Sequence, residues 1–290
     1  MLKGLKDRRK KINSDFCYLS ILSTFNHGSK TRFMKYVLIF FLAVISFGAI
    51  AQKTTTHYAQ FWNEVQFTRA LEGKWSLEFN FGNTWTSKEN ESNLFYKKSQ
   101  LYVRGWAHYY ASPRWKLSLF LAYFYNKNVP EISQTENSEI RVALQTTYFF
   151  HKIDYTLSTR VRFEDRSIEN NDGYMETVFR FRWQGKLVVP FNGKFIHAGT
   201  IYGLVSDEIF FKTESNVSGS SIFDRNRFTL GAGYSFTDDI VVEVTYANEY
   251  LPRATNTDWI NAAQVTLGFN NLFANLKNKK KKQTEVNDPN

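Results

Sequence analysis

Arginine and glutamate residues recur at a spacing of two in several segments, and they are the residues best suited to chemistry or solute binding. Arg160, Arg162, Glu164 and Arg166 form the longest such run. Residues two apart in a strand point to the same face, and neighbouring strands bring side chains to about 5 Å at the Cβ atoms. We therefore expect a charge ladder on one face of neighbouring strands, which would be the luminal face if the strands close into a barrel. The ladder is either structural or in contact with a solute. Its thirteen residues are Glu139, Arg141, Arg160, Arg162, Glu164, Arg166, Glu176, Arg180, Arg182, Glu208, Arg225, Arg227 and Glu243.

Enzymatic chemistry has a weaker basis in the sequence. Four histidines follow residue 51: His57, His108, His151 and His197. Nucleophilic catalysis needs a serine against a His–carboxylate pair, and the sequence alone places none there. It also lacks the His, Cys and acidic spacing of a metal site, so we expect no catalytic residues, no metal and no cofactor. An outer-membrane enzyme acting on lipid is the alternative, and it requires a Ser–His contact, with His108 as the histidine to test.

One glycine motif needs a structural interpretation. Gly231 and Gly233 flank an alanine inside an alternating segment that no helix follows, so they do not form a phosphate-binding loop. We interpret the two glycines as room for a bulky neighbour inside a barrel.

The elements that must position these residues are predicted by alternation of apolar and polar residues. In the segment 115–126, for example, Leu117, Leu119 and Leu121 alternate with Lys116 and Ser118. The same period, which is typical of half-buried strands, recurs in eleven segments: 58–69, 74–86, 98–111, 115–126, 138–150, 154–165, 174–188, 194–211, 225–236, 240–250 and 259–271. Each is long enough to cross a bilayer as a tilted strand, which takes about 9–11 residues.

The connections between these segments alternate in length. Short turns are expected at 71–73, 111–114, 151–152, 191–193 and 237–239, and longer polar loops at 87–97, 127–137, 166–173, 212–224 and 251–258. This alternation, with aromatic residues near segment ends, predicts an all-β, closed, antiparallel transmembrane β-barrel with short turns facing the periplasm. Bacterial barrels have an even number of strands, so eleven segments suggest ten or twelve strands.

The N-terminal region carries an export signal. An apolar run over 36–50 follows Met34 and Lys35 and ends at Ala49-Ile50-Ala51, which is typical of a cleaved signal peptide. We therefore divide the chain into an upstream extension or start-site artefact (1–33), a signal peptide (34–51), an outer-membrane barrel (52–275) and a basic disordered tail (276–290). The expected location is the outer membrane of a Gram-negative bacterium.

The net charge of +10 is concentrated at the two ends of the chain. Residues 1–51 carry +7 and residues 276–290 carry +3, so the barrel segment is near neutral. A neutral body argues against nucleic-acid binding. The expected partners are outer-membrane lipid and, during biogenesis, the barrel assembly machinery.

Several charged motifs occur in a fixed order along the chain. They are Glu139-Ile140-Arg141, the run 160–166, Arg180-Phe181-Arg182, Glu208-Ile209-Phe210 and the run 226–231. In these motifs, over roughly 57–272, the chain resembles the domain-of-unknown-function family 2490 of predicted outer-membrane β-barrels. The resemblance implies fold and location, and it implies no activity. The sequence thus predicts a porin-like, non-enzymatic barrel that is either structural or a narrow passive conduit.

Overall fold

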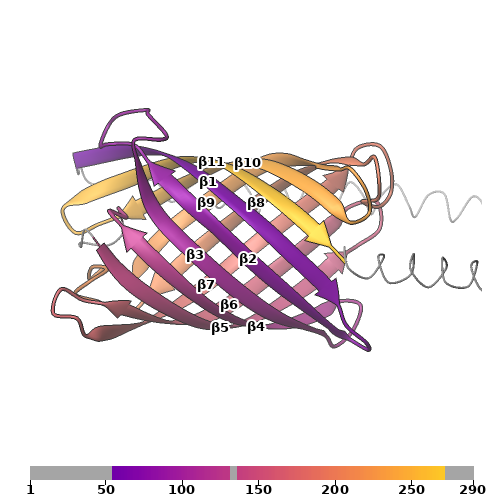
Figure 1. Ribbon diagram of the computed structural model, residues 1–290, viewed down its shortest axis with the longest axis horizontal. Helices are drawn as coiled ribbons and strands as arrows, with labels where there is room; N and C mark the ends of the chain where they lie inside the picture. The colour runs from indigo at the N-terminus through magenta and orange to yellow at the C-terminus, as the bar shows by residue number, and fades with distance from the viewer. Residues whose placement is uncertain (1–53, 131–135, 272–290) are drawn as a thin grey trace, which may run out of the picture. The chain divides into compact units, whose positions relative to one another are not determined.

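A computed structural model describes residues 54–130 and 136–271, which form one closed β-barrel (Figure 1). Its strands are β1 (Thr54–Ala70), β2 (Trp75–Thr86), β3 (Lys97–Tyr110), β4 (Trp115–Lys127), β5 (Glu136–His151), β6 (Thr156–Glu169), β7 (Met175–Pro190), β8 (Ile201–Lys212), β9 (Phe223–Ser235), β10 (Ile240–Pro252) and β11 (Asn256–Asn270). In these two ranges no helix is long and apolar enough to span a membrane. The expected upstream extension, signal peptide and basic tail lie outside the described residues.

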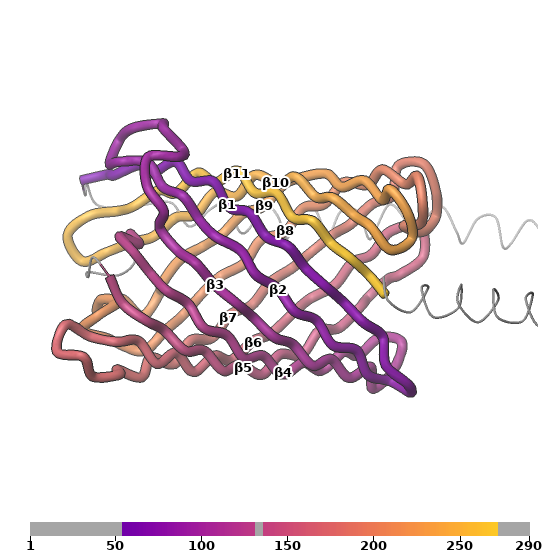
Figure 2. The backbone as a smooth tube through the Cα atoms, viewed as in Figure 1, coloured from indigo at the N-terminus to yellow at the C-terminus, as the bar shows by residue number. Residues whose placement is uncertain are grey.

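The barrel has eleven strands, which lies within the expected range of about 10–12 but is an odd number instead of ten or twelve. Each antiparallel pairing reverses the direction of the chain, so an odd number leaves the first and last strands running the same way. β1 and β11 accordingly pair in parallel, in register from Thr54 with Asn256 to Thr68 with Asn270. Figure 2 shows the indigo first strand and the yellow last strand side by side. All other neighbouring strands are antiparallel, as expected.

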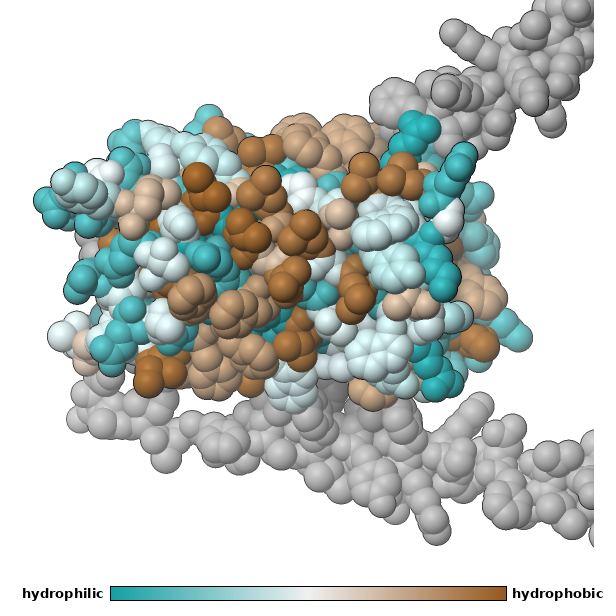
Figure 3. Space-filling view, turned by 90° about the horizontal axis from the view of Figure 1, so that it is seen from below, coloured by the Kyte–Doolittle hydropathy of each residue, from teal (hydrophilic) through white to brown (hydrophobic). Residues whose placement is uncertain are grey.

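The alternating sequence pattern separates the two faces of the wall. In β4, Leu117, Leu119 and Leu121 are exposed on the outside, whereas Ser118 and Phe120 are buried inside. Figure 3 shows apolar side chains gathered over the middle of the outer surface, with hydrophilic residues towards both ends. Asn63, a polar residue on this outer face, donates a hydrogen bond to Asn83 on the neighbouring strand (2.8 Å). The barrel therefore has an apolar outside and a polar inside.

The connections define two ends of the barrel. What we call the turn end carries residues 71–74, 111–114, 152–155, 191–200 and 236–239, and the loop end carries 87–96, 128–130, 170–174, 213–222 and 253–255. Two connections differ most from the predicted lengths, because β8 begins at Ile201 instead of residue 194 and the loop before β11 has only three residues. The longer turn is held by hydrogen bonds, including one from Asn192 Nδ2 to the carbonyl of Gly199 (2.9 Å), and Gly199 adopts a positive φ.

Candidate functional site: the charged lumen

Eleven of the thirteen predicted ladder residues form ion pairs inside the barrel. Their carboxylates are the most deeply buried groups, since Glu139, Glu164 and Glu208 are at most 1% exposed. Buried charges are tolerated when each is paired and hydrogen-bonded, and the geometry of these pairs therefore decides what the lumen can do.

Glu164, on β6, lies at the centre of the largest group of ion pairs. Its carboxylate accepts from Arg180 Nη2 (2.6 Å) and Arg182 Nη1 (2.7 Å), both on β7, and from Arg162 Nη1 on its own strand (3.2 Å). Arg182 also donates through Nη2 to Glu208 on β8 (2.8 Å), which pairs with Arg160. One planar guanidinium group thus connects carboxylates on two different strands, as the fork geometry of arginine allows.

The same group of ion pairs continues towards β10. Arg180 lies 3.5 Å from Asp224, and Arg225 pairs with both Asp224 (3.2 Å) and Glu249 (3.0 Å). Glu249 also pairs with Arg227. Together with Arg253, which lies 3.3 Å from Asp224, these residues form one connected set. We call it the Arg/Glu network: Arg160, Arg162, Glu164, Arg180, Arg182, Glu208, Asp224, Arg225, Arg227, Glu249 and Arg253.

A second, smaller group surrounds Glu139. Its carboxylate pairs with Arg141 on the same strand and with Arg166 on β6, where Nε lies 2.6 Å from Oε1. On β1, Glu64 pairs with Arg104 of β3 and accepts hydrogen bonds from the Tyr102 hydroxyl (2.7 Å) and Asn80 (3.0 Å). Charged side chains therefore also link β5 with β6 and β1 with β3.

Two ladder residues have other roles. Glu176, at the loop end, accepts a hydrogen bond from the backbone N–H of Asn216 (2.9 Å) in the loop 213–222. Glu243 accepts from the hydroxyl of Tyr202 (2.7 Å). Within residues 54–130 and 136–271 neither carboxylate lies in an ion pair.

Two tyrosines lie over glycines of the neighbouring strand. A Cβ atom on Gly233 would overlap the Tyr202 ring, and a Cβ atom on Gly82 would overlap the Tyr102 ring. The interpretation of the two glycines as room for a bulky neighbour is confirmed at Gly233, whereas a Cβ on Gly231 would meet the small side chain of Thr245 and the backbone of Val244. In both pairs the absence of a side chain lets the tyrosine hydroxyl reach a glutamate, the buried Glu64 or the half-buried Glu243.

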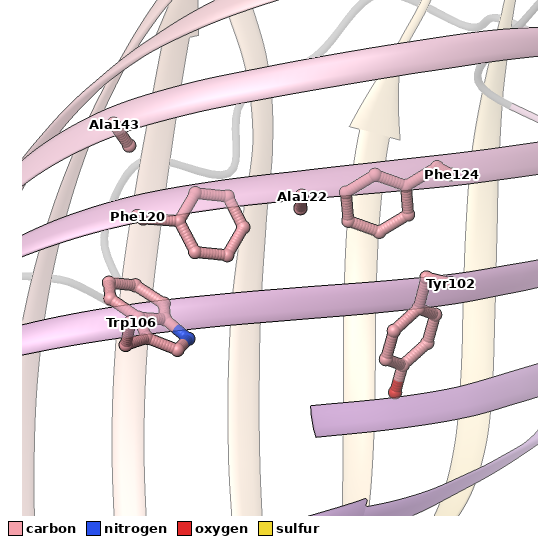
Figure 4. Packing of buried hydrophobic residues seen from close by; sticks show 6 residues of the cluster. All are labelled: Tyr102, Trp106, Phe120, Ala122, Phe124 and Ala143. Atoms are coloured by element: carbon pink, nitrogen blue, oxygen red, sulfur yellow. The ribbon is translucent and has the colours of Figure 1, made fainter. Parts of the chain in front are cut away.

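Aromatic rings pack against the arginine side chains. Tyr102, Trp106, Phe120 and Phe124 form a luminal cluster with two alanines on β3, β4 and β5 (Figure 4). The guanidinium carbon of Arg162 lies 4.7 Å from the Trp106 ring centroid, and that of Arg141 lies 3.8 Å from the centroid of Phe124. Desolvated cation–π contacts of this kind stabilise a buried cation by about 2 kcal/mol. The cluster therefore supports arginines that carry a positive charge away from water.

Loop 213–222 folds over the lumen at the loop end. Val217, which is 2% exposed, packs with Val129, Ile168 and Val178. Lys212 donates to the carbonyl of Gly219 within the same loop. Together with the Arg/Glu network, this apolar contact covers the part of the loop end that lies beside β6 and β7.

A cavity of about 630 Å³ remains inside the barrel and is lined by residues of all eleven strands. Its acidic lining residues are Glu64, Glu78, Glu208, Glu243 and Glu249. Its basic lining residues, twice as many, are Arg104, Lys116, Arg141, Arg160, Arg162, Arg180, Arg182, Lys186, Arg225 and Arg227. Lining residues near the turn end, such as Lys116, Ser158 and Lys186, are half-buried, whereas those of the Arg/Glu network are mostly under 10% exposed. The cavity is thus cationic and most accessible from the turn end.

The structure also contains a Ser–His–carboxylate contact. His108 lies with Nδ1 2.8 Å from the Ser118 hydroxyl and with Nε2 3.3 Å from Glu78. His108 and Ser118 are direct partners across the β3–β4 hairpin, so pairing the two segments about their short turn would have found this contact. Ser118 is 5% exposed and does not line the cavity. In the described part of the chain, no group of three or more His, Cys, Asp and Glu residues could hold a metal ion.

A comparison with known protein families supports the resemblance that was based on the charged motifs. Residues 59–261 match the model of a family described as a protein of unknown function, DUF2490. No curated protein matches the sequence. The match extends from β1 into β11 and includes every residue of the predicted ladder. The chain therefore belongs to the DUF2490 family, as the order of its Arg and Glu motifs suggested.

Proposed function

We propose that this chain is an integral outer-membrane protein whose barrel is closed internally by its own charged side chains. The proposal rests on the polarity of the two faces of the barrel wall, which is the reverse of that in a water-soluble protein: apolar side chains lie outside and charged side chains lie inside. Leu121 and Leu144, on the outer face, are 60% and 65% exposed, whereas Glu139 and Glu164 are at most 1% exposed inside. Water around the barrel would disfavour this arrangement, and a hydrocarbon surrounding favours it.

Aromatic pairs at both ends of the outer face support a membrane location. At the turn end the rings of Trp75 and Tyr109 lie 4.9 Å apart, and at the loop end those of Tyr250 and Trp259 lie 5.0 Å apart. Amphipathic aromatic rings settle at the two interfaces of a bilayer, so girdles at both ends of an apolar band are the pattern of outer-membrane barrels. The test is fractionation of a Gram-negative host, where the protein is expected in the outer membrane and resistant to extraction at alkaline pH. Recovery in the soluble fraction would refute the proposal.

A closed lumen is favoured over a conduit because the Arg/Glu network joins five neighbouring strands, β6 to β10, on the inner face, and its Arg162 packs on Trp106 of β3. Each carboxylate of that network is held by at least two arginines, and hydrated solutes would have to displace these contacts to pass. Two roles follow from the same residues. A structural barrel needs the pairs intact, and a narrow passive conduit needs a continuous water path beside them.

Planar-bilayer recording of the refolded chain 52–290 separates these roles. A heat-dependent gel shift serves as the control for folding. The proposal predicts a folded barrel without steady conductance. Steady conductance with anion preference would instead establish a conduit, and neutralising Arg160, Arg162, Arg180 and Arg182 would then alter that conductance.

A second function, hydrolysis of a lipid ester, is favoured only by the contact of Ser118 with His108. A carboxylate, a histidine and a serine that are linked by hydrogen bonds in that order can activate the serine as a nucleophile. Here, however, the serine hydroxyl is buried on the luminal side of the wall, away from any lipid around the barrel. Lipid turnover by the folded protein that is lost in Ser118→Ala and His108→Ala would support this function. No turnover by the folded wild-type protein would exclude it.

A further inference from the structure

We propose that the turn-end half of the lumen binds a small soluble oxyanion of the phosphate class, held by Lys116, Arg160 and Lys186. The inference deepens the proposed function and rests on it, since a lumen closed at the loop end makes the cavity a pocket with one mouth. All three side chains line the cavity of about 630 Å³, a volume in the range of small-molecule sites.

The strand register brings the three cations together. Lys116 on β4 pairs with Thr147 on β5, and Thr147 pairs with Arg160 on β6. Lys186 on β7 pairs with Ser158, two residues before Arg160 on the same face. Because strands are about 4.8 Å apart, the backbones of Lys116 and Arg160 are about 10 Å apart, and their long side chains can reach one ligand between them.

Neither lysine forms a close ion pair within the part of the barrel that the structure describes. Among residues 54–130 and 136–271, no carboxylate oxygen lies within 4.0 Å of either ammonium group. Glu78 exerts the strongest single charge interaction on Lys116, and three cations, Arg160, Lys152 and Lys186, repel it. Like charges gathered in a cavity repel one another, so a bound anion would be stabilised there.

The carboxylates of this region are already hydrogen-bonded to other groups. Glu78 contacts His108 (3.3 Å), Glu243 accepts from Tyr202 (2.7 Å), and Glu208 is shared by Arg160 and Arg182. These contacts keep the negative charges on the wall and leave the lysines available to a ligand.

Neutral donors beside the cations favour an oxyanion over a halide. Thr147, Ser158, Gln184 and Ser206 also line the cavity, and they come from β5, β6, β7 and β8. Phosphate groups accept several hydrogen bonds at once, and arginine and lysine bind them with charge-assisted bonds. A ring of ammonium, guanidinium and hydroxyl donors matches that need.

The experiment is calorimetric titration of the refolded chain 52–290 in detergent, with pyrophosphate as the probe at constant ionic strength. Wild-type protein is expected to bind it, and the double variant Lys116→Gln/Lys186→Gln is expected to lose about tenfold or more in affinity, given the strength of charge-assisted hydrogen bonds. The matched control is Lys127→Gln/Lys194→Gln, which removes the same charge from exposed residues outside the lumen and leaves the affinity unchanged.

Each possible result tests either the oxyanion site or the closed lumen. Absence of binding by the wild-type protein, or equal binding by the luminal variant, overturns the oxyanion site. Equal losses in the luminal and control variants mean that pyrophosphate binds by net charge alone, which also overturns it. The bilayer recording reports separately on the closed lumen, because a silent barrel that binds no pyrophosphate refutes only this inference, and a conducting barrel refutes the closure on which it rests.

Discussion

The guanidinium group of Arg182 lies 2.7 Å from the carboxylate of Glu164, its diagonal neighbour across the β6–β7 ladder, and both residues are buried. The carboxylate of Glu164 also forms ion pairs with Arg162 and Arg180, so it balances the charge of a locally cationic region. Removing one partner of a buried ion pair leaves an uncompensated charge, which is more costly than the pair is stabilising. The fold therefore depends on this carboxylate more than on any single arginine.

The variant Glu164→Gln is expected to lower the free energy of unfolding by about 3–5 kcal/mol, because Arg162, Arg180 and Arg182 lose their shared counter-charge. Urea unfolding of the refolded protein, followed by tryptophan fluorescence, measures the change. Glu91→Gln is the control, since Glu91 is half exposed and contacts only Lys88 in an exposed pair. Its effect should stay within about 0.5 kcal/mol. Equal effects of the two variants would show that the buried pairs do not stabilise the barrel.

The variant Gly82→Ala is expected to destabilise the barrel by about 1–3 kcal/mol, because the new methyl group overlaps Tyr102 and the backbone of Asn63. The same urea titration measures it. Gly185→Ala is the matched control, as nothing lies within 4 Å of a Cβ atom there. If both alanine variants unfold at the wild-type urea concentration, Tyr102 does not require the glycine.

The double variant Val65→Cys/Leu267→Cys is expected to form an intramolecular disulfide, because these residues are direct partners across the parallel β1–β11 seam. Their Cα atoms lie at the spacing of neighbouring strands, within the range that a disulfide bridges. Mobility on a non-reducing gel measures the bond, and the chain 52–290 has no other cysteine. In the control Val65→Cys/Val265→Cys, the second cysteine is shifted by two residues and should remain reduced. The reverse result would exclude the parallel register.

The variant Val217→Asp is expected to release loop 213–222 from the lumen, because it places a charge against Val129, Ile168 and Val178. The loss of the buried valine alone removes about 1.5–3 kcal/mol from the anchoring of the loop. Cleavage after Glu214 by a glutamate-specific protease measures the release. Ile222→Asp, at an exposed residue of the same loop, should leave cleavage at the wild-type rate. Rapid cleavage of the wild-type protein would show that Val217 does not hold the loop.

The strands of the barrel wall could be predicted from the sequence because the alternation of apolar and polar residues is a local pattern. Alternation in segments such as 115–126 depends only on which side of the wall a residue faces, and ten of the eleven predicted segments begin within four residues of the observed strands. The predicted segment 194–211 begins seven residues too early, because apolar Phe195 and Ile196 resemble the start of a strand although residues 191–200 form a turn held around Gly199. The eleven alternating segments match the eleven strands, and the preference for an even number follows only from a general tendency of bacterial barrels.

The sequence did not allow us to predict which luminal side chains pair with one another, because these contacts depend on the register between strands. Bulges shift that register between Thr84 and Trp85, Phe149 and His151, and Phe210 and Phe211. Asp224, which lies beside the last of these, was missed as a luminal residue for this reason. The contact of Ser118 with His108 was missed although it needs only the register of one hairpin.

The parallel seam has a consequence for how the chain folds. Every other pair of neighbouring strands is joined by a connection of at most ten residues, whereas β1 and β11 are separated by the whole wall. Closing a loop of that length costs more conformational entropy than closing any hairpin, and its contacts are non-local. We therefore expect hairpins to form first and the seam last, so that an unfinished barrel exposes two unpaired strand edges that run in the same direction.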